Sequence, residues 1–66
     1  MAPKRLGIAI KRLRKQREMT QAALAERVGV HRIYIAQIEV ATKTPSIATL
    51  EKIARALKVK VAELLK

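Results

Sequence analysis

The sequence has no cysteine, no tryptophan and no phenylalanine, and its 66 residues include one tyrosine and one histidine. The absence of cysteine excludes a disulfide scaffold, a cysteine-ligated zinc site and a thiol nucleophile. The single histidine has no carboxylate pair or nucleophile arranged around it in the sequence, so no metal site and no nucleophile–base pair is indicated. We therefore expect a protein that is not an enzyme and that binds no metal and no cofactor.

Acidic residues are also scarce, because 5 Asp and Glu face 15 Lys and Arg and give a formal net charge of +10. A charge of this size on so small a protein favours a polyanionic partner. Half of the residues are apolar, so the chain can fold in spite of its charge. It is too short for two hydrophobic cores, and we expect one domain over residues 1–66.

Long hydrophobic runs are missing. The apolar run near the start, residues 6–10, ends at Lys11. Five residues are too few for a signal-peptide core or a membrane span. We expect a cytoplasmic protein with no membrane partner.

Glycine and proline interrupt the sequence at only four places, which are Pro3, Gly7, Gly29 and Pro45. The residues between them are mostly good helix formers with apolar side chains at helical spacing, which favours an all-α fold. The spacing predicts helices over residues 5–17, 21–28, 32–40, 47–57 and 61–65.

Local signals support several of these boundaries. Thr20 and Ser46 each offer a side-chain oxygen to the first free N–H groups of the helix that follows. Gly29 stands just after the second helix, where a left-handed backbone is needed and glycine has no Cβ penalty. These signals predict two helix starts and one helix end.

The helical spacing also predicts which side chains are buried. In the first helix the inward positions are Leu6, Ile10, Leu13 and Arg17. In the fourth helix they are Ile47, Leu50, Ile53, Ala54 and Leu57.

Residues 20–40 have the spacing of a helix-turn-helix unit, two short helices joined by a tight glycine turn. Ile35 and Ile38 mark the buried side of the second of these helices. The opposite side then carries Ile33, Ala36, Gln37 and Val40, and it is flanked by Arg32 and Tyr34.

Several segments of the sequence resemble those of a known family. The segments that carry the resemblance are Leu13-Arg14-Lys15, Met19-Thr20-Gln21, Leu24 through Val30, Ile35 through Glu39, and Pro45 through Leu65. Together they are similar to the Cro/phage-repressor type of helix-turn-helix domain. The resemblance implies a compact five-helix bundle of the lambda-repressor-like type that binds double-stranded DNA, in most cases as a dimeric transcriptional repressor.

The resemblance also implies site residues. The base-contacting positions of the family fall on His31, Arg32, Ile33 and Gln37. Glutamine can pair with adenine, arginine with guanine, and isoleucine can pack on a thymine methyl group. Phosphate contacts are expected from Gln21, Tyr34, Thr42, Lys43, Thr44 and Arg12.

Arg14 and Glu39 are expected to form an ion pair, because the family often pairs these two positions. Both lie toward the buried side of their helices, where an unpaired carboxylate would be costly. Glu39 is then a structural residue and not a catalytic acid. The alternative is that both are solvated surface charges.

The sequence departs from the family at helix ends, where Glu18, Ala41 and Lys58 replace common glycines. Left-handed backbone at a residue other than glycine costs about 1 kcal/mol. Either these turns are strained or the helices end differently.

Two further readings stay open. The same fold serves as the antitoxin of a toxin–antitoxin pair, with a small protein toxin as partner. The first helix could be a cationic amphipathic membrane binder, although it has no aromatic residue for the interface. The favoured function is a nucleoid-associated transcriptional regulator.

The expected assembly is a homodimer, which could also form only on DNA. An apolar strip of Val61, Leu64 and Leu65 could be its seam, or could close the core of the monomer.

Overall fold

The computed structural model describes residues 3–66. Its helices are α1 (Pro3–Gln16), α2 (Gln21–Val28), α3 (Arg32–Glu39), α4 (Ile47–Ala56) and α5 (Val61–Leu64). No strand occurs between residues 3 and 66, and the all-α fold with five helices is confirmed. The helix bounds differ from the predicted ones by at most two residues, the largest shift being the start of α1 at Pro3. Proline is tolerated at a first helical position because its missing N–H has no helical partner there.

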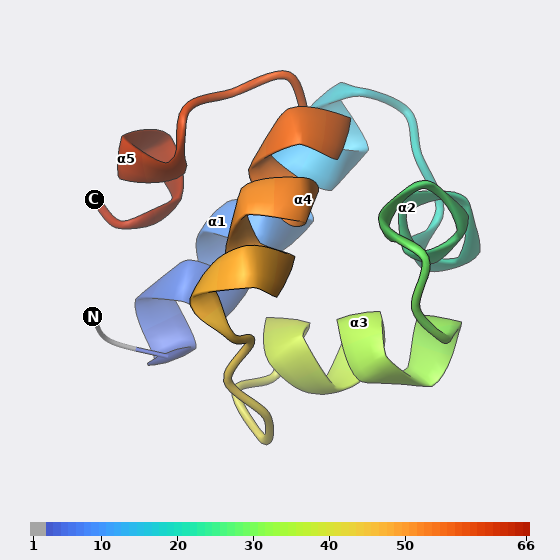
Figure 1. Ribbon diagram of the computed structural model, residues 1–66, viewed down its shortest axis with the longest axis horizontal. Coiled ribbons are helices and arrows are strands. Elements are labelled where there is room, and N and C mark those ends of the chain that lie inside the picture. Colours follow the sequence, from blue (N-terminus) through green and yellow to red (C-terminus); the bar gives the residue numbers. More distant parts are fainter. Residues whose placement is uncertain (1–2) are drawn as a thin grey trace.

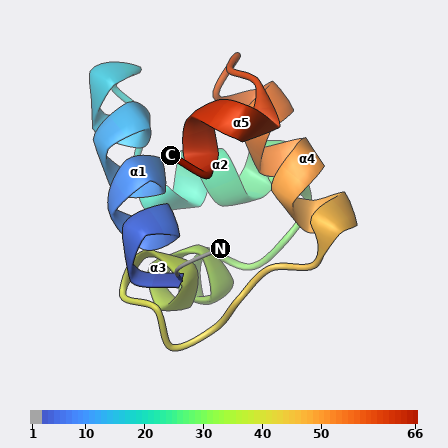
Figure 2. The same ribbon diagram turned by 90° about the vertical axis from the view of Figure 1, so that its left-hand side faces the viewer.

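The two ends of the molecule are built from different elements. Figures 1 and 2 both show α3, the loop over residues 40–46 and the N-terminal turn of α1 at one end of the molecule. The C-terminal ends of α1 and α4 lie at the opposite end in both views. In the part of the chain that is described, no helix is both long and apolar enough to cross a lipid bilayer.

The predicted caps are present at α2 and α4. Thr20 accepts a hydrogen bond at its Oγ1 from the backbone N–H of Ala23, at 3.0 Å. Ser46 accepts one at its Oγ from the N–H of Thr49, at 3.1 Å. Each cap satisfies a donor that the first helical turn cannot, so the positions of both helix starts follow from the sequence.

The turns that lack the family's glycines keep the left-handed backbone. Glu18, Ala41 and Lys58 have φ angles of 54°, 66° and 58°, and Gly29 has a φ of 87°. The turns are therefore strained, and the helices do not end differently from those of the family. Each residue with a Cβ costs about 1 kcal/mol in this conformation relative to a right-handed one.

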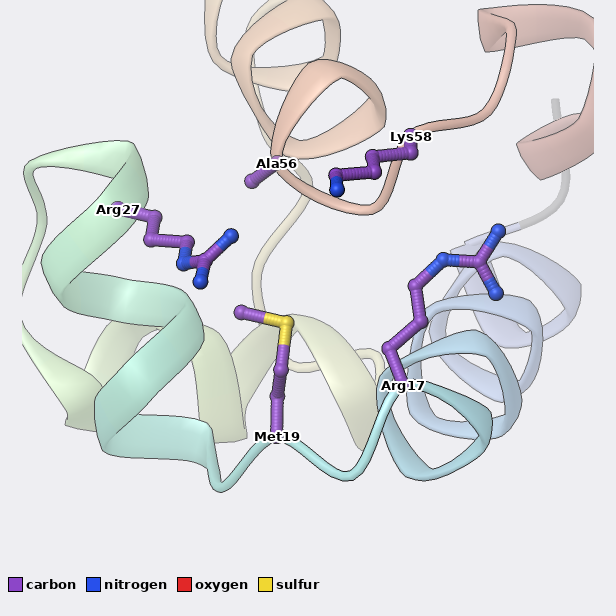
Figure 3. Close-up of a pocket in the computed structure, with 5 residues that line it drawn as sticks. All are labelled: Arg17, Met19, Arg27, Ala56 and Lys58. Atoms are coloured by element: carbon purple, nitrogen blue, oxygen red, sulfur yellow. The ribbon is translucent and has the colours of Figure 1, made fainter.

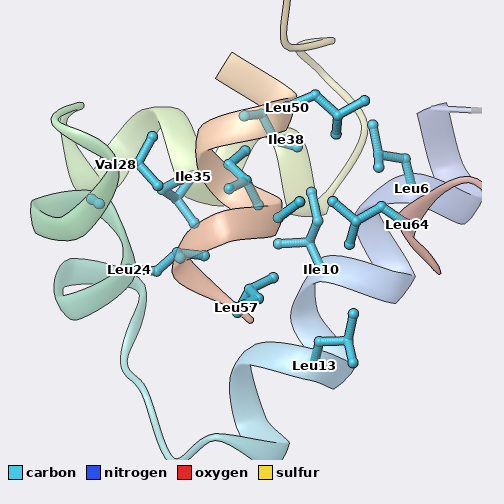
Figure 4. Packing of buried hydrophobic residues seen from close by; sticks show 13 residues of the cluster. Leu6, Ile10, Leu13, Leu24, Val28, Ile35, Ile38, Leu50, Leu57 and Leu64 are labelled. Carbon is cyan, nitrogen blue, oxygen red and sulfur yellow. The ribbon is translucent and has the colours of Figure 1, made fainter. Parts of the chain in front are cut away.

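One hydrophobic core unites the five helices, with side chains from each of them (Figure 4). Its members are Leu6, Ile10, Leu13, Leu24, Ala25, Val28, Ile35, Ile38, Leu50, Ile53, Ala54, Leu57 and Leu64. Helices of eight residues are unstable alone in water, so this shared burial is what holds α2 and α3 in helical form.

Two predicted core residues are not buried. Ile47 is 70% exposed, because it is the first residue of α4 and nothing covers the end of the helix there. Arg17 is exposed because α1 ends at Gln16 and the chain turns away at Glu18. The strip at the C-terminus also divides: Leu64 is fully buried in the core of the monomer, and Leu65 is 46% exposed.

Gly7 lies where α1 crosses the C-terminal end of α3. A Cβ built on Gly7 would stand 2.4 Å from the carbonyl oxygen of Glu39 and 2.6 Å from that of Ile38. Only glycine allows the two backbones to approach this closely. This contact fixes the position of α3, and it could not be predicted from the sequence, in which Gly7 reads only as an interruption.

Candidate nucleic-acid interface

The first turn of α3 presents side chains away from the core. Ile35 and Ile38 are buried, whereas Arg32 and Ile33 are exposed, Ile33 by 52%. Gln37, one turn after Ile33, is half-buried at the edge of the same outer side. This helix therefore offers a cation, an apolar side chain and an amide to a partner on its outer face.

His31 caps α3. Its Nδ1 accepts a hydrogen bond from the backbone N–H of Ile33 at 3.1 Å. A nitrogen that accepts carries no proton, so Nε2 is the donor that the ring has left for an outside partner. This capping bond holds the ring at the exposed start of the helix.

The loop after α3 is tied to the carbonyl oxygen of Gln37. The backbone N–H groups of Thr42 and Lys43 donate to it at 2.9 Å and 3.3 Å. The Oγ1 of Thr42 donates to the same atom at 3.2 Å. Thr42, Lys43 and Thr44 are all exposed, so the loop holds a lysine and two hydroxyl groups beside the outer face of α3.

A buried polar network joins α1, α2 and α3. Arg14 donates from Nε to Glu39 Oε2 at 2.7 Å and from an Nη to Oε1 at 3.2 Å. Its other Nη donates to the carbonyl oxygen of Met19 at 2.8 Å. Gln21 Nε2 donates to Glu39 Oε1 at 3.0 Å. Two parallel bonds between a guanidinium and a carboxylate fix the relative orientation of α1 and α3.

The contact of Gln21 with Glu39 was not anticipated. It places the start of α2 beside the C-terminal half of α3. It uses one of the two N–H donors of the Gln21 amide. The second N–H and the amide oxygen remain for a ligand. No sequence signal at either position points to this bond, since it depends on how the two helices are packed.

Negative charge is nearly absent from α3, from the loop after it and from the starts of α2 and α4. Glu39 is the one carboxylate between residues 28 and 50, and it is ion-paired. The first turns of α2, α3 and α4 contain no acidic residue. The free N–H groups at helix N-termini attract anions, so these three starts are suited to phosphate.

Two of the predicted phosphate contacts lie outside both the loop after α3 and the start of α2. Tyr34 is half-buried and packs against the core. Arg12 is exposed on α1, two residues and hence about 200° around the helix from Arg14, which faces α3. It lines a shallow hollow with Arg5 and Lys66, and the structure does not bring it beside α3.

Comparison with known proteins gives a consistent family. A family model described as helix-turn-helix matches residues 10–64. The immunity repressor protein of Bacillus phage phi105 is 44% identical over 57 residues, which are 86% of this chain and 40% of that protein. The chain thus spans less than half the length of that repressor.

Two solved structures that include DNA are similar over nearly the whole chain. The structure of SinR, a master regulator for biofilm formation in Bacillus subtilis, in complex with DNA has a TM-score of 0.87 and 39% identity, covering 92% of this chain and 98% of that one. The P22 c2 repressor in complex with a synthetic operator has a TM-score of 0.88 and 34% identity, covering 92% of each chain.

Proposed function

The chain belongs to the helix-turn-helix family, and on that premise we propose that it binds double-stranded DNA at specific sequences and represses transcription. The observation that carries the proposal is the outer face of α3, where Arg32, Ile33 and Gln37 stand on a helix whose other side is fixed in the core. A helix fits the major groove of B-form DNA, where each base pair presents a distinct pattern of donors and acceptors. Such a protein acts in the cytoplasm, at the nucleoid.

The side chains divide into two roles. Arg32, Ile33, Gln37 and the exposed Nε2 of His31 are assigned to base edges, guanine suiting the arginine, adenine the glutamine and a thymine methyl group the isoleucine. The loop residues Thr42, Lys43 and Thr44 are assigned to phosphates, together with Gln21 at the start of α2. Tyr34 on α3 and Arg12 on α1 are also assigned to phosphates.

No observation favours the antitoxin alternative. The proteins that this chain resembles are a phage immunity repressor and gene regulators, and the residues described above serve DNA recognition without a protein partner. The membrane-binding reading is not supported either, since the apolar side of α1 is buried in the core.

We expect Gln37→Ala and Lys43→Ala to weaken DNA binding in different ways. The preferred site is first selected from a random pool of duplexes. Loss of Gln37 is expected to cost about 1 to 3 kcal/mol on that site and much less on unrelated duplex, because only the preferred base supplies the matching donor and acceptor. Loss of Lys43 is expected to weaken both similarly and to lower the slope of log affinity against log salt by about one.

Matched controls exist for both variants. Gln16 and Lys11 are exposed on α1, and their alanine variants are expected to bind nearly as the parent does. Equal losses on preferred and random duplexes for Gln37→Ala would make that residue a backbone contact. An unchanged salt slope for Lys43→Ala would remove the loop from the interface.

We also propose that two copies bind together. A recognition helix of eight residues reaches only a few base pairs, which gives too little discrimination by itself. A pair related by two-fold symmetry requires a near-palindromic site with half-sites about 34 Å apart. We expect a footprint over two such half-sites and binding that rises steeply with protein concentration. A footprint over one asymmetric half-site would contradict this.

A further inference from the structure

The end of the molecule opposite α3 carries a hollow that the proposed function does not use (Figure 3). It has a volume of about 450 Å³ and is lined by Arg17, Met19, Arg27, Ala56 and Lys58. A smaller neighbouring hollow of about 150 Å³ is lined by Arg27, Lys52, Arg55 and Ala56. Because the two share Arg27 and Ala56, they form one strip, called here the basic strip.

The basic strip and the outer face of α3 can be occupied at the same time. The strip lies between α2 and the C-terminal ends of α1 and α4, which Figures 1 and 2 place away from α3 and its loop. A ligand on the strip would not compete with DNA on α3. The location of the basic strip therefore indicates a binding surface separate from the outer face of α3.

The cations of the basic strip are not neutralised within the part of the chain that the structure describes. The ion pairs in residues 3–66 are Arg14 with Glu39 and Lys66 with Glu63, and none involves the strip. Glu18 and Glu26 are neighbours of Arg17 and Arg27 along the chain, yet they do not pair with them. Five unpaired cations in so small an area repel one another and favour an anionic ligand.

Lys58 is a second observation that points to a ligand on the basic strip. It has a φ of 58°, a conformation in which glycine would be unstrained, and its ammonium group extends over the hollow toward Arg27 (Figure 3). Strained backbone is often found at functional sites, and here it accompanies a cation that lines the hollow.

The chemistry of the lining selects the kind of anion. Arginine and lysine are donors only, and no carboxylate, amide or hydroxyl side chain lines either hollow. A phosphodiester backbone brings acceptor oxygens and no donors, whereas a peptide also brings N–H groups that these side chains cannot satisfy. Met19 and Ala56 give an apolar floor on which a deoxyribose can pack. The fork of an arginine also matches phosphate oxygens.

We propose that the basic strip binds the sugar–phosphate backbone of a second DNA duplex, so that one molecule bridges two DNA segments. The bridging rests on the proposed function, because the first segment is held by α3. Phosphate oxygens recur in the same way along every duplex, so a strip that holds the sugar–phosphate backbone binds the second duplex without regard to its sequence.

The test uses two short duplexes. One carries the preferred site and is attached to a surface, and the other has an unrelated sequence and is free and fluorescent. The whole protein is loaded on the attached duplex and washed, and the free duplex is then added. We expect the parent to retain the fluorescent duplex. In the double variant Arg17→Gln, Arg27→Gln, retention is expected to fall about tenfold, while the amount of protein on the attached duplex changes little.

A matched variant and a second readout make the outcomes distinct. Lys11→Gln, Lys15→Gln removes the same charge from exposed positions of α1 outside the strip and is expected to keep the bridging. Thermal unfolding verifies that both variants fold. Retention of protein without retention of the free duplex by the parent would overturn the bridging and leave the proposed function intact. An equal loss in both variants would overturn it too, by reducing the strip to part of the overall charge.

Failure of the proposed function has a different signature. If the bound protein depends on the basic strip for its hold on the attached duplex, and Lys43→Ala has no effect on that hold, then α3 is not the DNA-binding element. Bridging by two independent surfaces would fall with it, whereas DNA binding by the strip would remain.

Discussion

Replacing Glu39 with alanine is expected to lower the free energy of unfolding by about 3 to 5 kcal/mol, a large share of what a domain of this size has. The side chain of Glu39 is 2% exposed and that of Arg14 is 9% exposed, so the pair is nearly free of water. Without Glu39, the guanidinium loses two of its three acceptors and stays buried with its charge unpaired. Gln21 loses its acceptor as well. Chemical unfolding followed by circular dichroism measures the loss.

The pair at the C-terminus is the matched control. Lys66 and Glu63 are 3.4 Å apart with side chains 74% and 50% exposed, and an ion pair of this kind contributes little. Glu63→Ala is therefore expected to unfold close to the parent. A double variant, Arg14→Met with Glu39→Leu, is expected to recover part of the loss, because no buried charge is left unpaired. Equal stabilities for Glu39→Ala and Glu63→Ala would show that burial of the pair has no energetic weight.

The helix boundaries could be predicted from the sequence because they depend on local chemistry. Thr20, Ser46 and Gly29 act on groups within four residues of themselves, and a single chain contains all that is needed to place them. The ion pair could also be predicted from the sequence. Arg14 and Glu39 each lie toward the inner side of their own helix, where a charge without a partner is costly.

Other features depend on which surfaces meet, and the sequence alone did not predict them. Ile47 has the spacing of a core residue but stands at a helix start that no element covers, so it is exposed. Gln21 finds Glu39 only because α2 packs beside α3. The basic strip collects cations from α2, from α4 and from the turns that follow α1 and α4, positions that are far apart in the sequence.

The assignment of individual residues to bases or phosphates depends on a partner that is not part of the fold. The chain fixes which side chains face outward and which are tied down, as Lys43 is by its backbone bond to Gln37. Whether an outward amide meets a base edge depends on the depth and angle at which α3 docks. The variants of Gln37 and Lys43 measure that directly.

Gly7→Ala is expected to destabilise the protein by about 1 to 3 kcal/mol or more, the cost of overpacking a contact that cannot relax. Alanine is the better helix former by about 1 kcal/mol, so propensity alone predicts the opposite sign in the middle of α1. The contact decides the outcome, because the atoms met at 2.4 and 2.6 Å are backbone oxygens of Glu39 and Ile38, which cannot rotate away. Either α1 or the end of α3 must move.

Gly29→Ala separates this effect from backbone strain. Its Cβ would meet nothing within 4 Å, but its φ of 87° is left-handed, so a loss of about 1 kcal/mol is expected from conformation alone. Gly7 has the reverse situation, ordinary helical backbone and no room. If Gly7→Ala loses more stability than Gly29→Ala and also loses affinity for the preferred duplex, then the approach of α1 to α3 sets both the stability of the domain and the position of its recognition helix. A Gly7→Ala variant that is more stable than the parent would mean that the helices are farther apart than described, and that the placement of α3 rests on the Arg14–Glu39 pair and the core alone.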